Sequence, residues 1–317
     1  MSRMIEVESL TKRYGRFLAL DNISFAANQG EIVGFLGPNG AGKTTTMRIL
    51  TGYMPPTAGR ARVAGFDVLE DSLAVRQHVG YLPETVRLYR EMTVRGYLKF
   101  LGQLRHVEHL RTRIDEVLEL VGLRERAGRL IRSLSKGMQQ RLGLAQAILH
   151  DPPVLILDEP TIGLDPHQVQ ELRRLIRQLG QTHTVLLSTH ILSEAEQLCD
   201  RVIIIDRGRI VAENTPDNLR DSLSRRSRLY VRVGKAQPGI DVARVLSGVR
   251  GVTGVEATAD GYLLSTHQND DVRPAVAAAI VAAGLPLLEM RPWAVTLEEI
   301  FLELTVSLEA PREGRHA

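Results

Sequence analysis

Short apolar runs that predict buried strands occur at three places in the first part of the chain. Ile32 to Leu36 and Val154 to Leu157 contain only apolar residues and glycine, and Thr182 to His190 is apolar at its centre. Runs of this length and composition are typical of strands inside a sheet. Residues 86–150 instead place apolar residues at helical spacing, as in Thr93 to Leu104. The alternation predicts an α/β domain over residues 1–222, with a helical subdomain over about residues 86–150.

A different pattern begins after the Arg- and Ser-rich segment Ser222 to Arg228. Apolar residues beyond it predict strands and helices in the order strand, helix, strand, strand, helix, strand, helix. The strands are expected at Leu229 to Val233, Val252 to Thr258, Tyr262 to Thr266 and Leu287 to Arg291, and the helices at Asp241 to Val249, Val272 to Ala283 and Thr296 to Leu304. This order predicts a small C-terminal α+β (ferredoxin-like) domain over residues 223–308. Residues 309–317 are expected to form a disordered tail.

A glycine-rich loop follows the first buried strand and precedes a segment that reads as a helix. It matches the P-loop pattern, in which glycines let successive N–H groups turn toward phosphate oxygens at a helix N-terminus. Lys43 is expected to reach the β and γ phosphates of a nucleotide, and the Thr44 hydroxyl to ligate Mg²⁺. A glycine turn that matches by chance is the structural alternative. The nucleotide-contacting residues expected here are Gly37, Pro38, Asn39, Gly40, Ala41, Gly42, Lys43, Thr44 and Thr45.

Two carboxylates follow the second buried strand directly. Asp158 and Glu159 should emerge at the carboxyl end of that strand, where open α/β sheets bind their ligands. Asp158 is expected to hold Mg²⁺, and Glu159 to polarise the water that attacks the γ phosphate. Taken alone, this pair would equally suit an acidic turn that caps a helix.

Two further residues complete the candidate site. His190 follows the third apolar run and is expected to hydrogen-bond the γ phosphate or to orient the attacking water. Asp165 lies shortly after Glu159 and directly before Pro166, where it would by itself be interpreted as a helix cap. A single histidine after a strand is more often structural, so the catalytic interpretation of His190 depends on the presence of the other motifs.

Composition limits the classes of protein to which this chain can belong. The hydrophobic fraction of 44% with 24% charged residues is that of a globular protein. No apolar run approaches the roughly 18 to 20 residues that span a bilayer, and residues 1–10 lack the features of a signal peptide, so we expect a cytoplasmic protein. No aromatic-studded basic stripe accompanies the formal net charge of +3, so no nucleic-acid partner is expected.

In their order along the chain, these motifs closely resemble those of the ATP-binding subunits of ABC transporters. The set comprises the loop Gly37 to Thr44, Glu84, the signature segment Ser135 to Gln139, Asp158-Glu159, Asp165 and His190. The resemblance covers roughly residues 4–220 and implies ATP and Mg²⁺ as cofactors, with ATP hydrolysis as the reaction. It implies that adenine stacks on Tyr14, for which an ordinary strand or turn tyrosine is the alternative.

The same resemblance implies a paired subunit. Two ATPase subunits of this family pair head to tail, and the signature segment of one closes the nucleotide of the other. The residues that it assigns to this contact are Ser135, Lys136, Gly137, Gln139 and Asp165. Ser135 and Gly137 would meet phosphate through a hydroxyl and a backbone N–H, whereas Lys136 would either add a charge beside the γ phosphate or remain solvated.

Two positions depart from the family pattern. Glu84 stands where most members have a glutamine that touches Mg²⁺ and couples to the membrane partner. As a metal contact, Glu84 would bring a negative charge that glutamine lacks. The signature reads Ser-Lys-Gly-Met-Gln instead of the commoner Ser-Gly-Gly-Gln-Gln. We expect the signature helix to begin at Met138.

The C-terminal region resembles one branch of the family. Val295 to Thr305 and Leu88 to Val94 resemble segments of ATPases that drive ABC-2 type export permeases. The leading hypothesis is therefore an ATPase subunit of an exporter, held at the inner face of the membrane by a separate integral permease. The alternative is a soluble ABC-type ATPase of DNA maintenance or translation. A third hypothesis is a nucleotide-sensing module that binds ATP without hydrolysing it.

Overall fold

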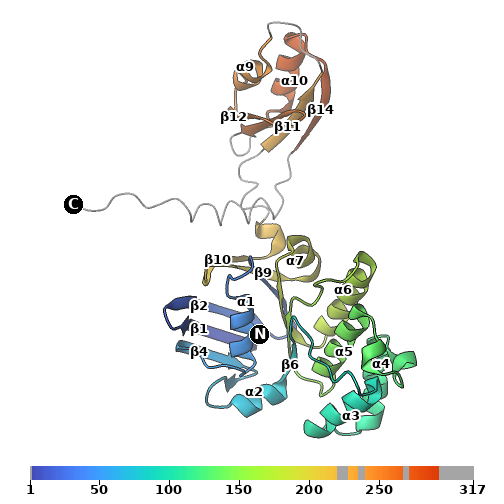
Figure 1. The fold of residues 1–317 in the computed structure, drawn as a ribbon. Helices are drawn as coiled ribbons and strands as arrows, with labels where there is room; N and C mark the ends of the chain where they lie inside the picture. The colour runs from blue at the N-terminus through green and yellow to red at the C-terminus, as the bar shows by residue number, and fades with distance from the viewer. Residues whose placement is uncertain (1, 220–227, 235–239, 267–270, 293–317) are drawn as a thin grey trace, which may run out of the picture. The chain divides into compact units, whose positions relative to one another are not determined.

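The chain folds into two compact units, Met1–Pro216 and Asp217–Ala317 (Figure 1). The computed structural model describes residues 2–219, 228–234, 240–266 and 271–292. Among these residues, no helix combines the length and the apolar character that a bilayer crossing requires.

The centre of the first unit is a six-stranded sheet in the order β10-β9-β3-β8-β7-β6. Five of its strands are parallel, and β10 pairs antiparallel with β9 at one edge. Every residue of β3, β7 and β8 is buried, in keeping with the apolar residues that predominate in their sequences. The strand bounds are β3 Ile32–Leu36, β6 Val79–Leu82, β7 Val154–Asp158, β8 Thr184–Thr189, β9 Arg201–Asp206 and β10 Arg209–Asn214.

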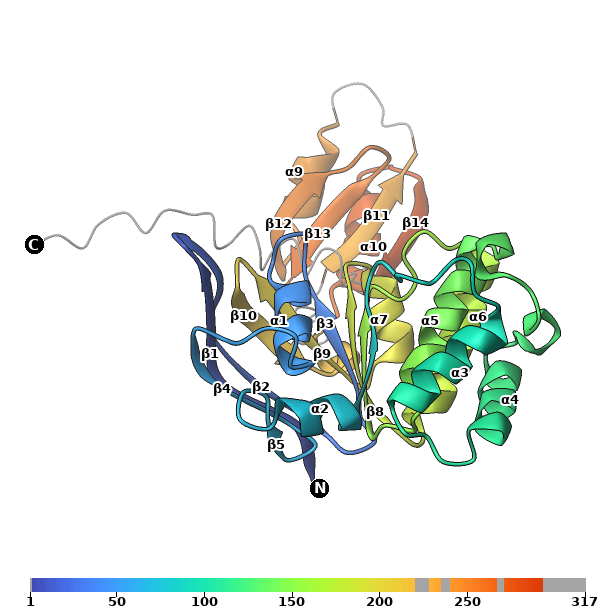
Figure 2. The ribbon, with the colours of Figure 1, turned by 60° about the horizontal axis from the view of Figure 1, so that its bottom comes forward.

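A second, antiparallel sheet in the order β2-β1-β4-β5 packs beside the first. Its strands are β1 Arg3–Tyr14, β2 Phe17–Asn28, β4 Ala58–Val63 and β5 Phe66–Asp67. Helix α1 (Lys43–Leu50) lies between the two sheets, as Figure 2 shows. Met47, Ile49 and Leu50 of this helix join one apolar core with both sheets, including Ile5, Phe25, Phe35 and Ile156. The C-terminal half of α1, the helix that follows the glycine loop, is therefore fixed in the core.

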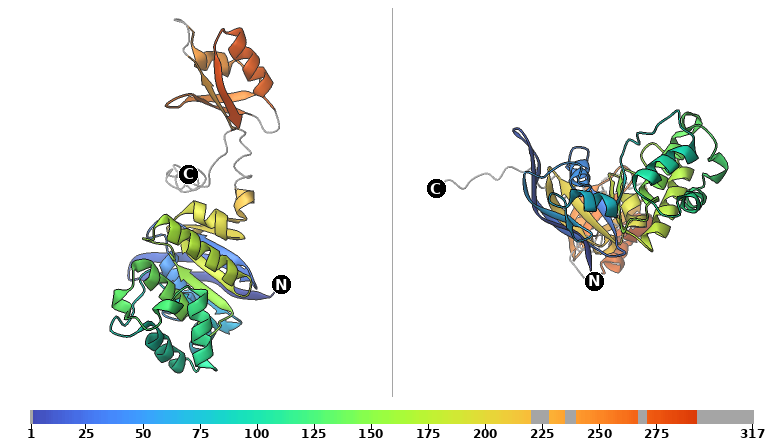
Figure 3. Two further views of the ribbon diagram at one scale, coloured as in Figure 1. Left: turned by 90° about the vertical axis from the view of Figure 1, so that its right-hand side faces the viewer. Right: turned by 90° about the horizontal axis from the view of Figure 1, so that it is seen from below.

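Most other helices of this unit gather on the side of the central sheet away from β1, β2 and β4 (Figure 3). They include the predicted helical subdomain. The bounds are α2 Ser72–His78, α3 Val94–Leu104, α4 Leu110–Leu120, η1 Arg124–Arg126, η2 Ile131–Ser133, α5 Lys136–Ile148, α6 Pro166–Gly180 and α7 Leu192–Leu198. The expected start of the signature helix at Met138 was wrong: α5 begins at Lys136, because the Ser135 hydroxyl accepts a hydrogen bond from Met138 N and caps it.

The second unit contains an antiparallel sheet in the order β12-β13-β11-β14, with helices α9 and α10. In chain order the elements are β11 Arg228–Val233, α9 Val242–Ser247, β12 Val252–Ala257, β13 Tyr262–Thr266, α10 Arg273–Ala282 and β14 Leu287–Pro292. Val231, Leu246 and Leu264 lie in one buried cluster with Val276 and Ile280. Numbered within this unit the strand order is 2-3-1-4, as in a ferredoxin-like domain. The helix predicted at Thr296 to Leu304 and the predicted tail lie outside the described residues.

Candidate functional site

Three strands bring the predicted site residues to one edge of the central sheet. Strand β8 lies between β3 and β7, with Leu36 opposite Thr189 and Asp158 opposite Ser188. All three strands run parallel, so the glycine loop after β3, Glu159 after β7 and His190 after β8 emerge together. The backbone N–H of Glu159 donates to both the carbonyl oxygen and the hydroxyl of Ser188, at 3.2 and 2.9 Å.

The glycine loop adopts the conformation that its sequence predicts. Gly42 precedes α1 with φ of 112°, where a Cβ would lie 2.7 Å from the Leu20 side chain. A Cβ on Gly37 would lie 2.3 Å from the carbonyl oxygen of Ile205. Both positions therefore require glycine, and the first turn of α1 keeps its N–H groups for an incoming anion.

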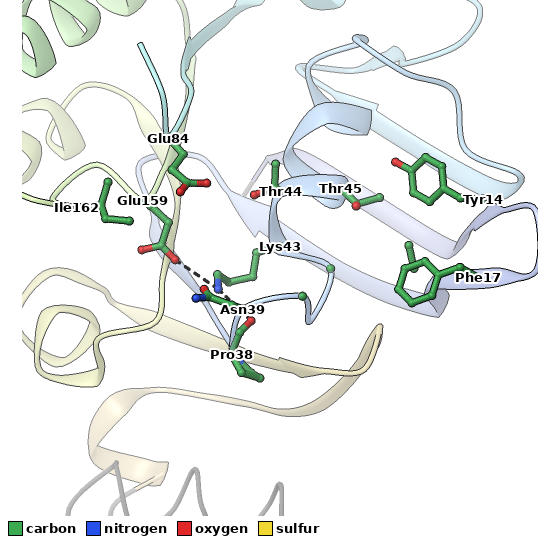
Figure 4. Close-up of a pocket in the computed structure, with 13 residues that line it drawn as sticks. Tyr14, Phe17, Pro38, Asn39, Lys43, Thr44, Thr45, Glu84, Glu159 and Ile162 are labelled. Atoms are coloured by element: carbon green, nitrogen blue, oxygen red, sulfur yellow. Dashed lines mark hydrogen bonds and ion pairs between the residues drawn. The ribbon is translucent and has the colours of Figure 1, made fainter.

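The loop borders a cavity of about 370 Å³ (Figure 4). Many residues that line it were predicted from the sequence, and Phe17, Ala19 and Ile162 were not. Gly37 and Ala41 belong to the loop but do not line the cavity, since both face the protein interior. The predicted residues that line it are Tyr14, Pro38, Asn39, Gly40, Gly42, Lys43, Thr44, Thr45, Glu84 and Glu159.

Lys43 and Glu159, two buried residues of opposite charge, line this cavity, and the exposed His190 lies beside Glu159 outside its lining. Lys43 Nζ donates to the carbonyl oxygens of Gly37 and Pro38, at 2.6 and 3.2 Å, and lies 3.3 Å from Glu159 Oε1. The other oxygen of Glu159 lies 2.9 Å from Nδ1 of His190. Glu159 has a φ of 47°, which is unusual for a residue with a side chain. The structure thus brings Lys43, Glu159 and His190 together from three separate segments.

Asp158 lies beside the Thr44 hydroxyl, behind the cavity. Its Oδ1 accepts hydrogen bonds from Ser188 Oγ at 2.6 Å and from Thr44 Oγ1 at 3.3 Å. Its Oδ2 is buried and has no hydrogen-bond partner among the described residues. Burial raises the pKa of Asp158, although the bonds from Ser188 and Thr44 act the other way. The Thr44 hydroxyl and a carboxylate that has one unpaired oxygen are a donor set that suits Mg²⁺, which usually takes one or two carboxylates together with substrate phosphates.

Two aromatic rings border the outer end of the cavity. Tyr14 ends β1 and Phe17 begins β2, and the two residues pair across the β1–β2 hairpin. Tyr14 is 44% exposed and Phe17 63%, and both rings are labelled at the same side of the loop in Figure 4. The Tyr14 hydroxyl donates to Met54 Sδ at 3.0 Å, and Lys12 Nζ lies 5.3 Å from the ring centroid. The short hairpin Tyr14-Gly15-Arg16-Phe17 is the sequence signal that could have identified Phe17.

The signature residues lie apart from this cavity within one chain. None of Ser135, Lys136, Gly137 and Gln139 lines it, and Ser135 and Lys136 are exposed. Lys136 and Gln139 line a separate groove with Glu84, which borders both spaces. Asp165 caps α6 by accepting a hydrogen bond from Gln168 N at 3.0 Å. A single chain therefore contains a glycine loop with acidic residues close to it, whereas its signature residues do not line the cavity that this loop borders.

Comparison with known proteins gives consistent matches. The family described as "ABC transporter" matches residues 20–162. The daunorubicin resistance ATP-binding protein DrrA3 of Streptomyces coeruleorubidus is 39% identical over 95% of each chain. The bacitracin transport ATP-binding protein BcrA of Bacillus licheniformis is 42% identical over 73% of this chain and 74% of its own. The linearmycin resistance ATP-binding protein LnrL of Bacillus subtilis is 35% identical over 95% of this chain and 98% of its own.

Solved structures match the first unit. The structure of an ATP-binding subunit of an ABC transporter covers 70% of this chain and 93% of its own, at 32% identity and a TM-score of 0.64. The dimeric structure of a bacterial ABC transporter cassette covers 67% of this chain and 98% of its own, at 27% identity and a TM-score of 0.60.

Proposed function

The chain belongs to the ATP-binding subunits of ABC transporters, and on that premise we propose that it drives a separate export permease of the ABC-2 type. Subunits of this family bind and hydrolyse ATP, dimerise and pair with a transmembrane permease, and this chain is an ATPase of that kind. The rival hypothesis of a soluble ATPase in DNA maintenance or translation is not retained, because the similar proteins carry names of transport and drug resistance.

The contacts of Glu159 with Lys43, which lines the same cavity, and with His190 beside it are the observation that carries the catalytic assignment. Lys43 would bind the β and γ phosphates once it exchanges Glu159 for phosphate oxygens. Glu159 would then accept a proton from the attacking water, and His190 would hold that carboxylate or the γ phosphate in place. This arrangement supports hydrolysis over simple nucleotide sensing.

We assign Mg²⁺ to the Thr44 hydroxyl and Asp158, with Glu84 facing the same cavity. When bound, the ion would neutralise charge on the β and γ phosphates. The buried, unpartnered Oδ2 of Asp158 supports this assignment, since a carboxylate oxygen kept from water needs a cation or a donor.

The position of the signature supports a head-to-tail dimer on Mg-ATP. Ser135 and Lys136 are exposed at the start of α5, and the N-terminus of this helix is suited to bind a phosphate. Neither residue lines this chain's own cavity, so that phosphate would belong to a nucleotide bound by another copy. A second copy would bring Ser135, Lys136, Gly137 and Gln139 to the nucleotide, with Asp165 near the contact. A group supplied in trans raises phosphoryl-transfer rates by about a thousandfold or more, so an isolated monomer is expected to hydrolyse ATP slowly.

The permease is proposed to dock on the helical subdomain beside Glu84. Tyr89 and Phe100 are exposed and lie with ring centroids 5.9 Å apart, and Leu104 is exposed on the same helix α3. Exposed aromatic residues of this kind are enriched at protein interfaces. Docking there would place the chain at the cytoplasmic face of a membrane, and export as the direction accords with relatives named for drug resistance.

The proposal is tested by expressing the chain with and without a candidate ABC-2 type permease. We expect the two proteins to copurify, and Tyr89→Ala with Phe100→Ala to abolish copurification while ATP binding persists. Steady hydrolysis by the purified complex, stimulated by Mg²⁺, is the expected activity. Association with ribosomes or DNA that withstands nuclease, with no membrane partner, would contradict it.

A further inference from the structure

Glu194 is a buried carboxylate that lies outside the cavity and was not singled out by sequence analysis. It belongs to α7 and is only 2% exposed. A charge removed from water is costly unless it is paired and hydrogen-bonded. The partners of the Glu194 carboxylate therefore indicate its structural role.

Those partners come from three different segments. Glu194 Oε2 accepts hydrogen bonds from Thr161 Oγ1 at 2.7 Å and from Thr189 Oγ1 at 3.1 Å. Glu194 Oε1 lies 3.3 Å from Arg173 Nη2 of helix α6. Both threonines are buried, so their hydroxyls contact this carboxylate away from solvent.

The two threonines stand next to the residues assigned to hydrolysis. Thr161 lies in the turn that begins at Glu159, and Thr189 directly precedes His190. Thr189 Oγ1 also accepts a hydrogen bond from Ile191 N at 3.0 Å, so it fixes the backbone on the far side of His190. Glu159 and His190 contact each other across these loops. The Glu194 carboxylate thus hydrogen-bonds to a residue of each of the two loops.

Arg173 extends the connection to α6. The same helix begins at Pro166 and is capped by the Asp165 side chain, and Arg173 also donates to Gln197 Oε1 at 2.6 Å. A shift of α6 would therefore act on Glu194, and through the threonines on both loops.

We propose that Glu194 is a positioning residue for hydrolysis: it holds the Glu159 turn and the His190 loop in one arrangement and links that arrangement to helix α6. This inference rests on the proposed function. Glu194 does not line the cavity, so it would act on turnover through Glu159 and His190. Misplacement of reacting groups by about 1 Å can lower a rate about a hundredfold.

The first test removes one hydroxyl at constant shape. Thr161→Val in the full chain is expected to lower kcat for Mg-ATP about tenfold or more, with the Kd for ATP within about twofold of wild type. Thr161→Ser keeps the hydroxyl and is expected to restore turnover. Steady-state hydrolysis gives kcat, and titration with a fluorescent ATP analogue gives Kd.

Thr184→Val is the matched control. Thr184 lies on the same strand as Thr189, is as fully buried, and its hydroxyl bonds the Asn28 carbonyl oxygen and Gly30 N away from the cavity. We expect it to lower the melting temperature without changing kcat. Equal kcat in Thr161→Val and wild type, or equal losses in Thr161→Val and Thr184→Val, would overturn the proposal.

The second test is Glu194→Gln, which keeps an acceptor for the threonines and removes the charge facing Arg173. We expect reduced kcat with retained ATP binding in the folded fraction, as judged by a cooperative melting transition. Turnover equal to wild type would refute the proposal. Failure of the wild-type chain to hydrolyse ATP, alone or with its permease, would instead refute the proposed function, so the two failures are distinguishable.

Discussion

Lys43 Nζ lies 3.3 Å from Glu159 Oε1, and both side chains are buried. The cation expected to hold the γ phosphate and the carboxylate expected to activate water are thus paired with each other in this structure. On the proposed function, phosphate oxygens would take the place of Glu159 at Lys43, and Glu159 would keep its contact with His190. Nucleotide binding would in this way release the carboxylate expected to serve as the base.

Glu159→Gln is expected to slow hydrolysis by about a hundredfold or more, because an amide cannot accept the proton of the attacking water. ATP binding should be retained or become tighter, since phosphate no longer competes with a carboxylate for Lys43. Size-exclusion chromatography with Mg-ATP should show a stable dimer. Glu70→Gln, at an exposed position, is the control. Unchanged turnover would remove Glu159 from the base role.

Lys43→Ala is expected to weaken ATP binding by about 2 kcal/mol or more, or roughly thirtyfold, because it removes the buried cation expected to bind the β and γ phosphates. Isothermal titration calorimetry with a non-hydrolysable ATP analogue measures the change. Lys99→Ala, on the exposed face of α3, should bind as wild type does. Normal affinity in Lys43→Ala would count against the phosphate role of the loop.

Tyr14→Ala and Phe17→Ala are each expected to weaken ATP binding, because stacking of a base on an aromatic ring is worth about 1–3 kcal/mol. Tyr14 should contribute more, since Met54 and Lys12 hold its ring in place. Inorganic triphosphate, which has no base, should bind both variants as it binds wild type. Tyr53→Ala serves as the control at a more exposed tyrosine. If Phe17→Ala binds ATP normally, the ring borders the cavity without contacting the base.

His150 predicts a pH dependence of stability. Burial lowers the pKa of His150 to about 4, helped by Arg105 and Arg113 and opposed by Val79 O and Asp151. Because the folded-state pKa lies below the ordinary value, the contribution is present above about pH 6.5 and is lost as the pH falls toward 4. His150→Gln should therefore show a shallower fall in the free energy of unfolding between pH 6.5 and 4, measured by urea titration. An equally steep fall would contradict the assignment.

Local residue patterns were enough to predict the individual loops, strands and helix starts of this protein. Glycines at 37, 40 and 42 fix the loop, because backbone conformation depends on a few neighbouring residues. Asp165 with Pro166 predicted the start of α6, and the apolar runs predicted the three central strands for the same reason. The order of elements in the second unit was likewise readable from the alternation of short runs.

The tertiary structure alone decided which of these parts meet. Strand β8 lies between β3 and β7, which brings Glu159 to His190 across 31 residues of sequence. The pairing of Glu194 with Thr161 and Arg173 joins three segments in the same way, and no local pattern specifies it. The signature was expected to serve a partner from resemblance, and only the fold places Ser135 and Lys136 exposed and away from their own cavity. Such contacts depend on strand order and on burial of charge, which act between residues far apart in the chain.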